Sequence, residues 1–408
     1  MNKRFLFPSL LLLLTVVLAA CGGDGGAARK EPPSASEPAS ALRVAKQREV
    51  EAAGGRILSL SPDGQRLVVE QGFELLCIFR AAPFEEQACA LLKDRTHPAR
   101  QSIAWSPDAS RIAFTEDATR IMIDSDVWLI DVKTGWFTDL TDDGVGGNLI
   151  NPEPAGAEPL VDLAPAWSPD GKKLLFSRTA FLAQGSRDTA LYSVPAGGGD
   201  AEQLLVADAE YPLAVWHGLH WSGDGKKILY TVAHSQHDDP DNAIWMAGRD
   251  GQDPRLLLGP DPELGPPMLM GVAARGNKAL ILYYLAQGTL GAAPNVSYFF
   301  ILDLETGAVA PLKQATGQEV EFSSLSKARL SPDGSKVLYV YRYLAGEEPE
   351  FRLAVRDVEG GAENVLLVSA EPLGFQTELG LGLDWAADDT LYVATSPSSG
   401  RLITLGTE

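Results

Sequence analysis

The chain has 408 residues, of which 45% are hydrophobic, and a formal net charge of −20 at pH 7. This composition is sufficient for a large buried core. Such an acidic surface repels phosphate backbones and anionic lipid headgroups, so we expect no nucleic acid partner and no membrane binding through a basic patch.

The start of the chain has the pattern of a bacterial export signal. Lys3 and Arg4 form a basic region, and the apolar run at 9–18 is too short to span a bilayer as a permanent helix. The run leads into Leu-Ala-Ala-Cys, which resembles the lipobox of bacterial lipoproteins. The resemblance implies that residues 1–20 are a signal peptide that is removed and that Cys21 carries lipid, such as palmitate. The alternative is an ordinary secretory signal that ends near a chance cysteine.

The residue after this cysteine bears on the membrane that would hold the anchor. Many lipoproteins retained in the inner membrane carry aspartate there, whereas this chain has Gly22. The resemblance therefore implies attachment to the outer membrane of a bacterial cell envelope, facing the periplasm, through the N-terminal lipid only. Residues 21–45 are dominated by Gly, Ala, Pro and Ser, which predicts a disordered tether. Residues 46–408 are expected to form one domain.

A short motif recurs through this domain with a period of about fifty residues. Its clearest copy is Trp-Ser-Pro-Asp-Gly at 167–171, where one apolar strand ends and a second soon follows. Proline presets φ for a type I turn, aspartate accepts hydrogen bonds from nearby backbone N–H groups, and glycine adopts the left-handed conformation. We therefore interpret the aspartates of these turns as structural rather than catalytic. They are Asp63, Asp108, Asp170, Asp224 and Asp333.

Two further short strands follow each turn, which predicts four antiparallel strands per repeat. Counting a degenerate copy at 274–277, the repeats predict an all-β fold, a seven-bladed β-propeller. Six blades is the alternative if the degenerate copy is only an insertion. The last repeat lacks its own fourth strand, so we expect a strand within 42–53 to complete it and to remove both open sheet edges.

The copies resemble the WD40-like (PD40) repeats of the TolB propeller, which also occur in propeller domains of prolyl oligopeptidase relatives. The resemblance covers residues 56–395. It implies the propeller fold and suggests work in an envelope complex. The chain offers no room for the N-terminal α/β domain of TolB, so TolB's own partners are not implied.

Two cysteines besides Cys21 lie in the domain. Cys77 and Cys89 are placed symmetrically about Pro83, and each lies in an apolar, strand-like segment. Two strands joined by a loop at Pro83 would place the cysteines opposite each other, and an oxidising periplasm would allow a disulfide. The alternative is a pair of buried free thiols.

The two faces of the predicted propeller differ in the length of their connections. Turns between strands 1 and 2 and between strands 3 and 4 share one face, and these are short. Loops between strands 2 and 3 and connections between blades share the other face, and many are long. Long loops on one face indicate a binding surface, with passive variation as the alternative. The long segments are 116–126, 142–164, 179–189, 233–243, 285–296 and 343–350.

Histidines cluster in the fourth repeat. His217, His234 and His237 are predicted on the long-loop face, Asp238 follows directly, and imidazoles beside carboxylates suit Zn²⁺ or Mn²⁺. Oligogalacturonate lyases look similar in repeat type and hold a metal with propeller histidines. His220 should point to the opposite side of its strand from His217 and pack within the blade. We expect no cofactor, with solvated or packed histidines; a zinc, manganese or calcium site is the alternative.

No phosphate-binding loop, zinc-protease helix or serine-nucleophile elbow occurs in the sequence, so no catalytic residue is predicted. We expect a monomeric, non-enzymatic scaffold that binds an unknown envelope protein or peptide through the long-loop face. The rival is a metal-dependent propeller enzyme, such as a polysaccharide lyase, that uses the histidines of the fourth repeat. A third hypothesis is a sensor of small ligands in the central channel.

Overall fold

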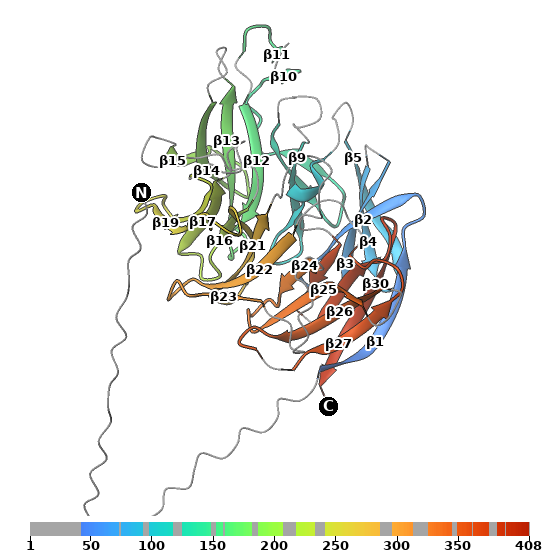
Figure 1. Ribbon diagram of the computed structural model, residues 1–408. Coiled ribbons are helices and arrows are strands. Elements are labelled where there is room, and N and C mark those ends of the chain that lie inside the picture. Colours follow the sequence, from blue (N-terminus) through green and yellow to red (C-terminus); the bar gives the residue numbers. More distant parts are fainter. Residues whose placement is uncertain are drawn as a thin grey trace, which may run out of the picture. The chain divides into compact units, whose positions relative to one another are not determined.

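Figure 1 shows the computed structural model of the chain, in which Ala41–Glu408 form one compact unit. The structure describes residues 42–72, 75–92, 98–116, 125–147, 152–157, 160–181, 187–206, 218–232, 241–285, 296–312, 325–344, 349–360, 362–374, 382–387 and 389–407. Among these residues no helix is long and apolar enough to cross a membrane.

The described residues form seven four-stranded antiparallel sheets, which are the blades of a propeller (Figure 1). The predicted all-β, seven-bladed propeller is therefore confirmed. Blade 1 contains β2 (Gly55–Leu60), β3 (Arg66–Gln71), β4 (Leu75–Ala81) and β5 (Phe84–Leu91). Blade 2 contains β6 (Ala104–Trp105), β7 (Arg111–Thr115), β8 (Val127–Asp131) and β9 (Phe137–Asp139). Blade 3 contains β12 (Leu160–Trp167), β13 (Lys173–Phe181), β14 (Arg187–Pro195) and β15 (Glu202–Val206).

The remaining blades repeat this arrangement. Blade 4 contains β16 (Leu219–Trp221), β17 (Lys227–Val232), β18 (Ala243–Gly248) and β19 (Arg255–Leu258). Blade 5 contains β20 (Pro267–Val272), β21 (Lys278–Leu285), β22 (Val296–Asp303) and β23 (Val309–Pro311). Blade 6 contains β24 (Leu325–Leu330), β25 (Lys336–Leu344), β26 (Pro349–Asp357) and β27 (Asn364–Ser369). Blade 7 contains β28 (Leu383–Trp385), β29 (Thr390–Ala394), β30 (Ser399–Thr407) and β1 (Leu42–Glu51).

Two small elements lie outside the blades. The 3₁₀-helix η1 (Arg100–Ser102) precedes β6, and the two-residue strands β10 (Gly146–Gly147) and β11 (Pro152–Glu153) form a separate hairpin between blades 2 and 3. The degenerate repeat at 274–277 forms the turn between β20 and β21, so it belongs to a full blade. This decides between seven blades and six.

Blade 7 closes the ring with strands from both ends of the domain. Strand β1 pairs antiparallel with β30, from Leu42 beside Thr407 to Glu51 beside Ser399. The predicted closing strand is thus present, and β1 begins at Leu42, within the last residues of the segment expected to form the tether. Its apolar residues Leu42 and Val44 pack against the cluster between blades 6 and 7, which favours an ordered strand over a solvated tether.

Buried apolar clusters fill the joints between blades, and the described residues contain one such cluster for each of the seven joints. Tryptophans at the ends of three inner strands add a hydrogen bond to the preceding blade. The indole N–H of Trp105 donates to Ser59 Oγ at 2.9 Å, and that of Trp221 donates to the carbonyl of Ala166 at 3.2 Å. Trp167 bonds the preceding blade in the same way. The inner strands are therefore fixed relative to one another.

The turns between strands 1 and 2 are stabilised by their own serine and aspartate. In blade 4, Ser222 Oγ donates to Asp224 Oδ1 at 2.6 Å, and the backbone N–H of Lys226 donates to the same oxygen at 3.0 Å. The hydroxyl bond is the main cause that holds the pKa of Asp224 below its usual value. Blades 1, 2, 3 and 6 repeat both contacts with Asp63, Asp108, Asp170 and Asp333.

Neighbouring turns also pack on one another, and we call the face that they form the tight-turn face. A Cβ on Gly223 would lie 2.7 Å from the carbonyl oxygen of Gly276, which explains why blade 4 has glycine where other copies have proline. A Cβ on Gly276 would lie 2.6 Å from the carbonyl oxygen of Asp333 in the next turn. Backbone bonds join further pairs of turns, such as Arg275 N–H to Pro332 O at 2.8 Å.

Candidate functional site: the central channel

One position of the inner strand is small in four blades and carries an imidazole, a guanidinium or a carboxylate in the other three. It is the residue directly before the last residue of the strand, and the strand registers show that it is equivalent in all seven blades. Because inner strands surround the axis of a propeller, this position forms a ring at one level of the central channel. The ring consists of Ser59, Ala104, Ala166, His220, Gly271, Arg329 and Asp384.

Arg329 and Asp384 form the charged part of this ring. Arg329 Nε lies 3.9 Å from Asp384 Oδ1, which is an ion-pair distance beyond that of a hydrogen bond. The other carboxylate oxygen of Asp384 accepts the backbone N–H of Leu60 at 2.9 Å. The side chains of Arg329 and Asp384 are 23% and 19% exposed, so neither is fully buried.

Burial at the channel position disfavours the charged forms of both Arg329 and Asp384. Burial lowers the pKa of Arg329, against the attraction of Asp384. Burial also raises the pKa of Asp384, against the charge of Arg329 and the Leu60 hydrogen bond. A guanidinium that is paired only at long range has lost hydration without full replacement, so it retains a strong tendency to bind an anion.

His220 places an imidazole at the same level of the channel. Its backbone pairs with Leu229 of β17, and its side chain is half-buried. Burial first, and the charge of Arg329 second, lower the pKa of His220 to about 4, so the imidazole is neutral at pH 7. A neutral imidazole offers one donor and one acceptor nitrogen. The sequence analysis expected His220 to pack within the blade, and the structure shows it half-buried at this ring position.

Blade 5 lies between the blades that carry His220 and Arg329, and it contributes Gly271 at this level. A Cβ on Gly271 would meet no atom within 4 Å, so open space adjoins the glycine. In the order of the blades, the open space at Gly271 therefore lies between the ring positions of His220 and Arg329. Neither the side chain of Arg329 nor that of His220 makes a hydrogen bond with any described residue, whereas the side chain of Asp384 makes one.

The other predicted metal ligands lie elsewhere in the chain. His217, His234, His237 and Asp238 fall outside the described residues, as does Cys21. Within the described part, the one group of three potential metal ligands is Cys77, Glu86 and Cys89. Its two sulfur atoms are joined to each other, which removes the thiolates that a metal would need.

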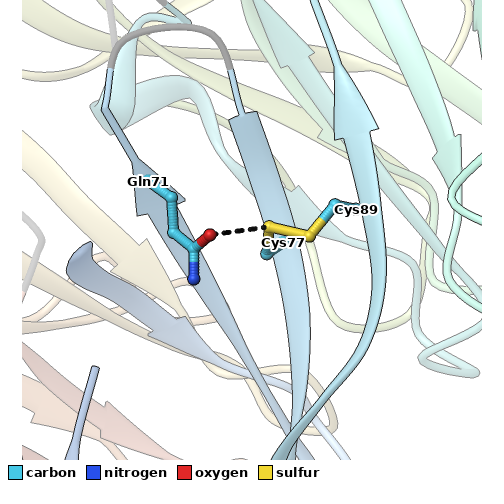
Figure 2. The surroundings of a disulfide bond; sticks show 3 residues. All are labelled: Gln71, Cys77 and Cys89. Carbon is cyan, nitrogen blue, oxygen red and sulfur yellow. Dashed lines mark hydrogen bonds between the residues drawn. A yellow bond between two sulfur atoms is a disulfide. The ribbon is translucent and has the colours of Figure 1, made fainter. Parts of the chain in front are cut away.

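The disulfide joins directly paired residues of β4 and β5, as Figure 2 shows. This is the pairing weighed from the sequence, with Pro83 in the short turn between the strands. Cys77 is fully buried, and Gln71 of β3 lies beside it, with 3.6 Å between Cys77 Sγ and Gln71 Oε1 (Figure 2). The bond therefore links the two outer strands of blade 1.

A second buried ion pair has a different character. Arg178 of β13 donates two hydrogen bonds of 2.7 Å to Asp162 of β12, which is fully buried. The same guanidinium also bonds the carbonyl of Thr141 at 3.3 Å and lies over Phe176. This bidentate pair is satisfied internally. We therefore assign it to the joint between blades 2 and 3 and not to ligand binding.

Sequence reasoning did not find Arg329 and Asp384 as site residues. The available signal was a charged residue directly before the last residue of a predicted inner strand, a place where other repeats have small residues. Interpreting that signal requires the register of all seven blades and the order of the ring. A single repeat does not provide it.

No protein-family model matches the chain, and no curated protein matches it. Solved structures do resemble it. TolB from Agrobacterium tumefaciens is 19% identical, with a TM-score of 0.43, over 64% of this chain and 81% of that one. An oligogalacturonate lyase in complex with manganese is 12% identical, with a TM-score of 0.50, over 89% of this chain and 98% of that one.

A prolyl endopeptidase is 14% identical, with a TM-score of 0.52, and the match covers 87% of this chain but 50% of the endopeptidase. The lyase and the endopeptidase thus differ in their activities. At these identities the similarity establishes the β-propeller fold alone.

Proposed function

We propose that the protein is an envelope-anchored lipoprotein whose TolB-like propeller is a non-enzymatic scaffold for a protein or peptide. Binding takes place through the long-loop face, defined as the face that carries the strand 2–3 loops and the connections between blades. The observation that carries this proposal is the difference between the two faces. The tight-turn face consists of short turns that hydrogen-bond to one another, and the opposite face carries the long connections.

The locking of the tight-turn face supports the proposal in physical terms. Its turns bond internally through serine and aspartate, and they bond one another through backbone contacts such as Ala387 N–H to Pro62 O at 2.8 Å. On the opposite face the connections are longer, for example from β17, which ends at Val232, to β18, which begins at Ala243. A rigid frame that presents long loops on one face is a common arrangement for recognition.

Site-specific photocrosslinking in envelopes tests the choice of face. A photoreactive amino acid at Asp142 or Asp241 would sample the long-loop face, and the same group at Gln65 or Lys172 would sample the tight-turn face. All four positions are exposed. We expect the same adduct from the first two positions and none from the controls. Adducts from the tight-turn positions alone, or from no position, would contradict the proposal.

The lipid anchor requires its own test, since Cys21 lies outside the described residues. Labelled palmitate should be incorporated into the full-length chain and not into Cys21→Ala. Cell fractionation should place the labelled chain in the outer membrane. Labelling that persists in the variant would refute the anchor and would leave the binding face to be judged by the crosslinks.

A further inference from the structure

The ring of the channel contains hydrogen-bonding capacity that the protein itself does not use. A guanidinium has five N–H donors, and none of those of Arg329 forms a hydrogen bond with a described residue. Its recorded partner is Asp384, at the long distance of 3.9 Å from Nε. The two terminal nitrogens therefore remain available, in the geometry that matches the two oxygens of a carboxylate.

The local charge favours an anion at this place despite the acidic chain. Lys327 lies on the same strand as Arg329, and its charge lowers the pKa of Asp384, as that of Arg329 does. Arg329 meets Asp384 only at 3.9 Å, so the charge of its guanidinium is incompletely balanced at this level of the channel. His220, neutral at pH 7, can supply a further hydrogen bond donor without adding charge.

We propose that the channel binds a peptide through one carboxylate group, held in a bidentate manner by Arg329 and by a hydrogen bond from His220. This inference rests on the proposed function, whose ligand class it names. A single carboxylate is the favoured chemistry because the net charge of −20 opposes a polyanion, such as an acidic polysaccharide. The open space at Gly271 accommodates the ligand between the two side chains.

Calorimetry on the full-length chain tests this inference with four probes. They are acetyl-trialanine with a free carboxyl terminus, its carboxyl-terminal amide, acetate and trigalacturonate. The free acid should bind at least about tenfold more tightly than the amide, the equivalent of one lost hydrogen bond to a charged group. Equal affinity of acid and amide, or no saturable binding of the acid, would overturn the inference. Tighter binding of trigalacturonate than of the peptide acid would overturn the peptide assignment.

Variants link the binding to the channel. Arg329→Gln should weaken binding of the free acid at least about tenfold and leave binding of the amide unchanged. Arg275→Gln is the matched control, since Arg275 is exposed on the tight-turn face. Gly271→Leu tests the same site without removing a charge, because its side chain would enter the open space and block the ligand. Thermal unfolding of each variant shows whether the fold is intact, and normal binding by both channel variants would refute the site.

The photocrosslinks separate this inference from the proposed function. If Arg329→Gln weakens binding of the peptide acid at least about tenfold while the adducts at Asp142 and Asp241 persist, the channel site and the scaffold are both supported. If the adducts persist and no carboxylate binds, the scaffold stands and the carboxylate site is wrong. If the carboxylate binds and no adduct forms, the channel site stands and the assignment of partner binding to the long-loop face is wrong.

Discussion

Glycines of the tight-turn face show how closely neighbouring blades approach at the level of single residues. Gly276 has an ordinary negative φ, so its lack of a side chain reflects contact rather than backbone conformation. A Cβ at this position would lie 2.6 Å from the carbonyl oxygen of Asp333, which is backbone and cannot rotate away. The degenerate repeat therefore keeps glycine although it has lost serine and aspartate.

We predict that Gly276→Ala lowers the free energy of unfolding by about 1–3 kcal/mol, because the turns of blades 5 and 6 must separate. Gly259→Ala is the matched control, since a Cβ there meets nothing within 4 Å. The measurement is the urea midpoint of each full-length variant. A midpoint for Gly276→Ala equal to that of the control would show that the turns do not constrain each other.

Metal binding by the fourth repeat remains a prediction about individual side chains. His217, His234, His237 and Asp238 lie outside the described residues, and we expect no stoichiometric Zn²⁺, Mn²⁺ or Ca²⁺ in the purified protein. Elemental analysis of the wild-type chain and of His217→Ala combined with His234→Ala measures this directly. One bound transition metal that the double variant loses would favour the metal-dependent enzyme instead.

At the scale of elements, the turns between strands 1 and 2 couple stability to pH. Hydrogen bonds to the carboxylates, led by the serine hydroxyl, hold the pKa of Asp108, Asp170 and Asp224 below the usual value. A pKa that is lower in the folded state stabilises the fold above the unfolded pKa of about 3.9. This contribution is lost as the pH falls below that value and passes through the folded pKa.

Asp224→Asn should therefore lower the urea midpoint at pH 7 and have a smaller effect at pH 3, below the unfolded pKa, where part of this contribution has been lost. The expected change is below about 1 kcal/mol, since the side chain of Asp224 is 54% exposed and solvent screens its interactions. Asp200→Asn, at an exposed position outside these turns, is the control. An effect of equal size at both pH values would contradict an electrostatic origin.

The elements were predictable from sequence to the extent that their causes are local. Serine, proline, aspartate and glycine specify the turn through their own hydrogen bonds and φ preferences, so the number of blades followed from counting copies. Composition alone does not identify the first residues of β1 as a strand, because Leu42 and Val44 lie in a segment of tether-like composition. Their order depends on β30, which is more than three hundred residues away.

The channel site could not be predicted in the same way. His220, Arg329 and Asp384 are isolated residues in three repeats, and no spacing within one repeat connects them. The ring brings them to one level, and the glycine of blade 5 leaves space beside them. Such a site depends on the closed order of the blades, which is a property of the whole fold.

At the scale of the whole molecule, closure of the propeller depends on the closing strand β1. Val50 of β1 is 3% exposed and packs in the cluster between blades 7 and 1, together with Tyr392 and Ile57. Val50→Ala should lower the free energy of unfolding by about 1.5–3 kcal/mol, from lost burial and the cavity that remains. Glu49→Ala is the control, because the side chain of Glu49 is 79% exposed.

Hydrogen exchange gives this prediction a readout of its own. Amides of β30 should exchange faster in Val50→Ala than in the wild type, since loosened pairing of β1 exposes the edge of β30. Faster exchange throughout all blades by the same factor would instead indicate one cooperative unfolding unit. Unchanged exchange in β30 would contradict a role for Val50 in closure.

The register of β1 on β30 also has a mechanical consequence. The chain enters the propeller at Leu42, beside Thr407, and runs along the full length of β30 to Glu51. A force applied to the N-terminal side of Leu42 along the strand axis would load the hydrogen bonds of this ladder together, in shear, rather than peel them one after another. The strand that completes the last blade would thus also be the element that resists tension between an anchor and a bound partner.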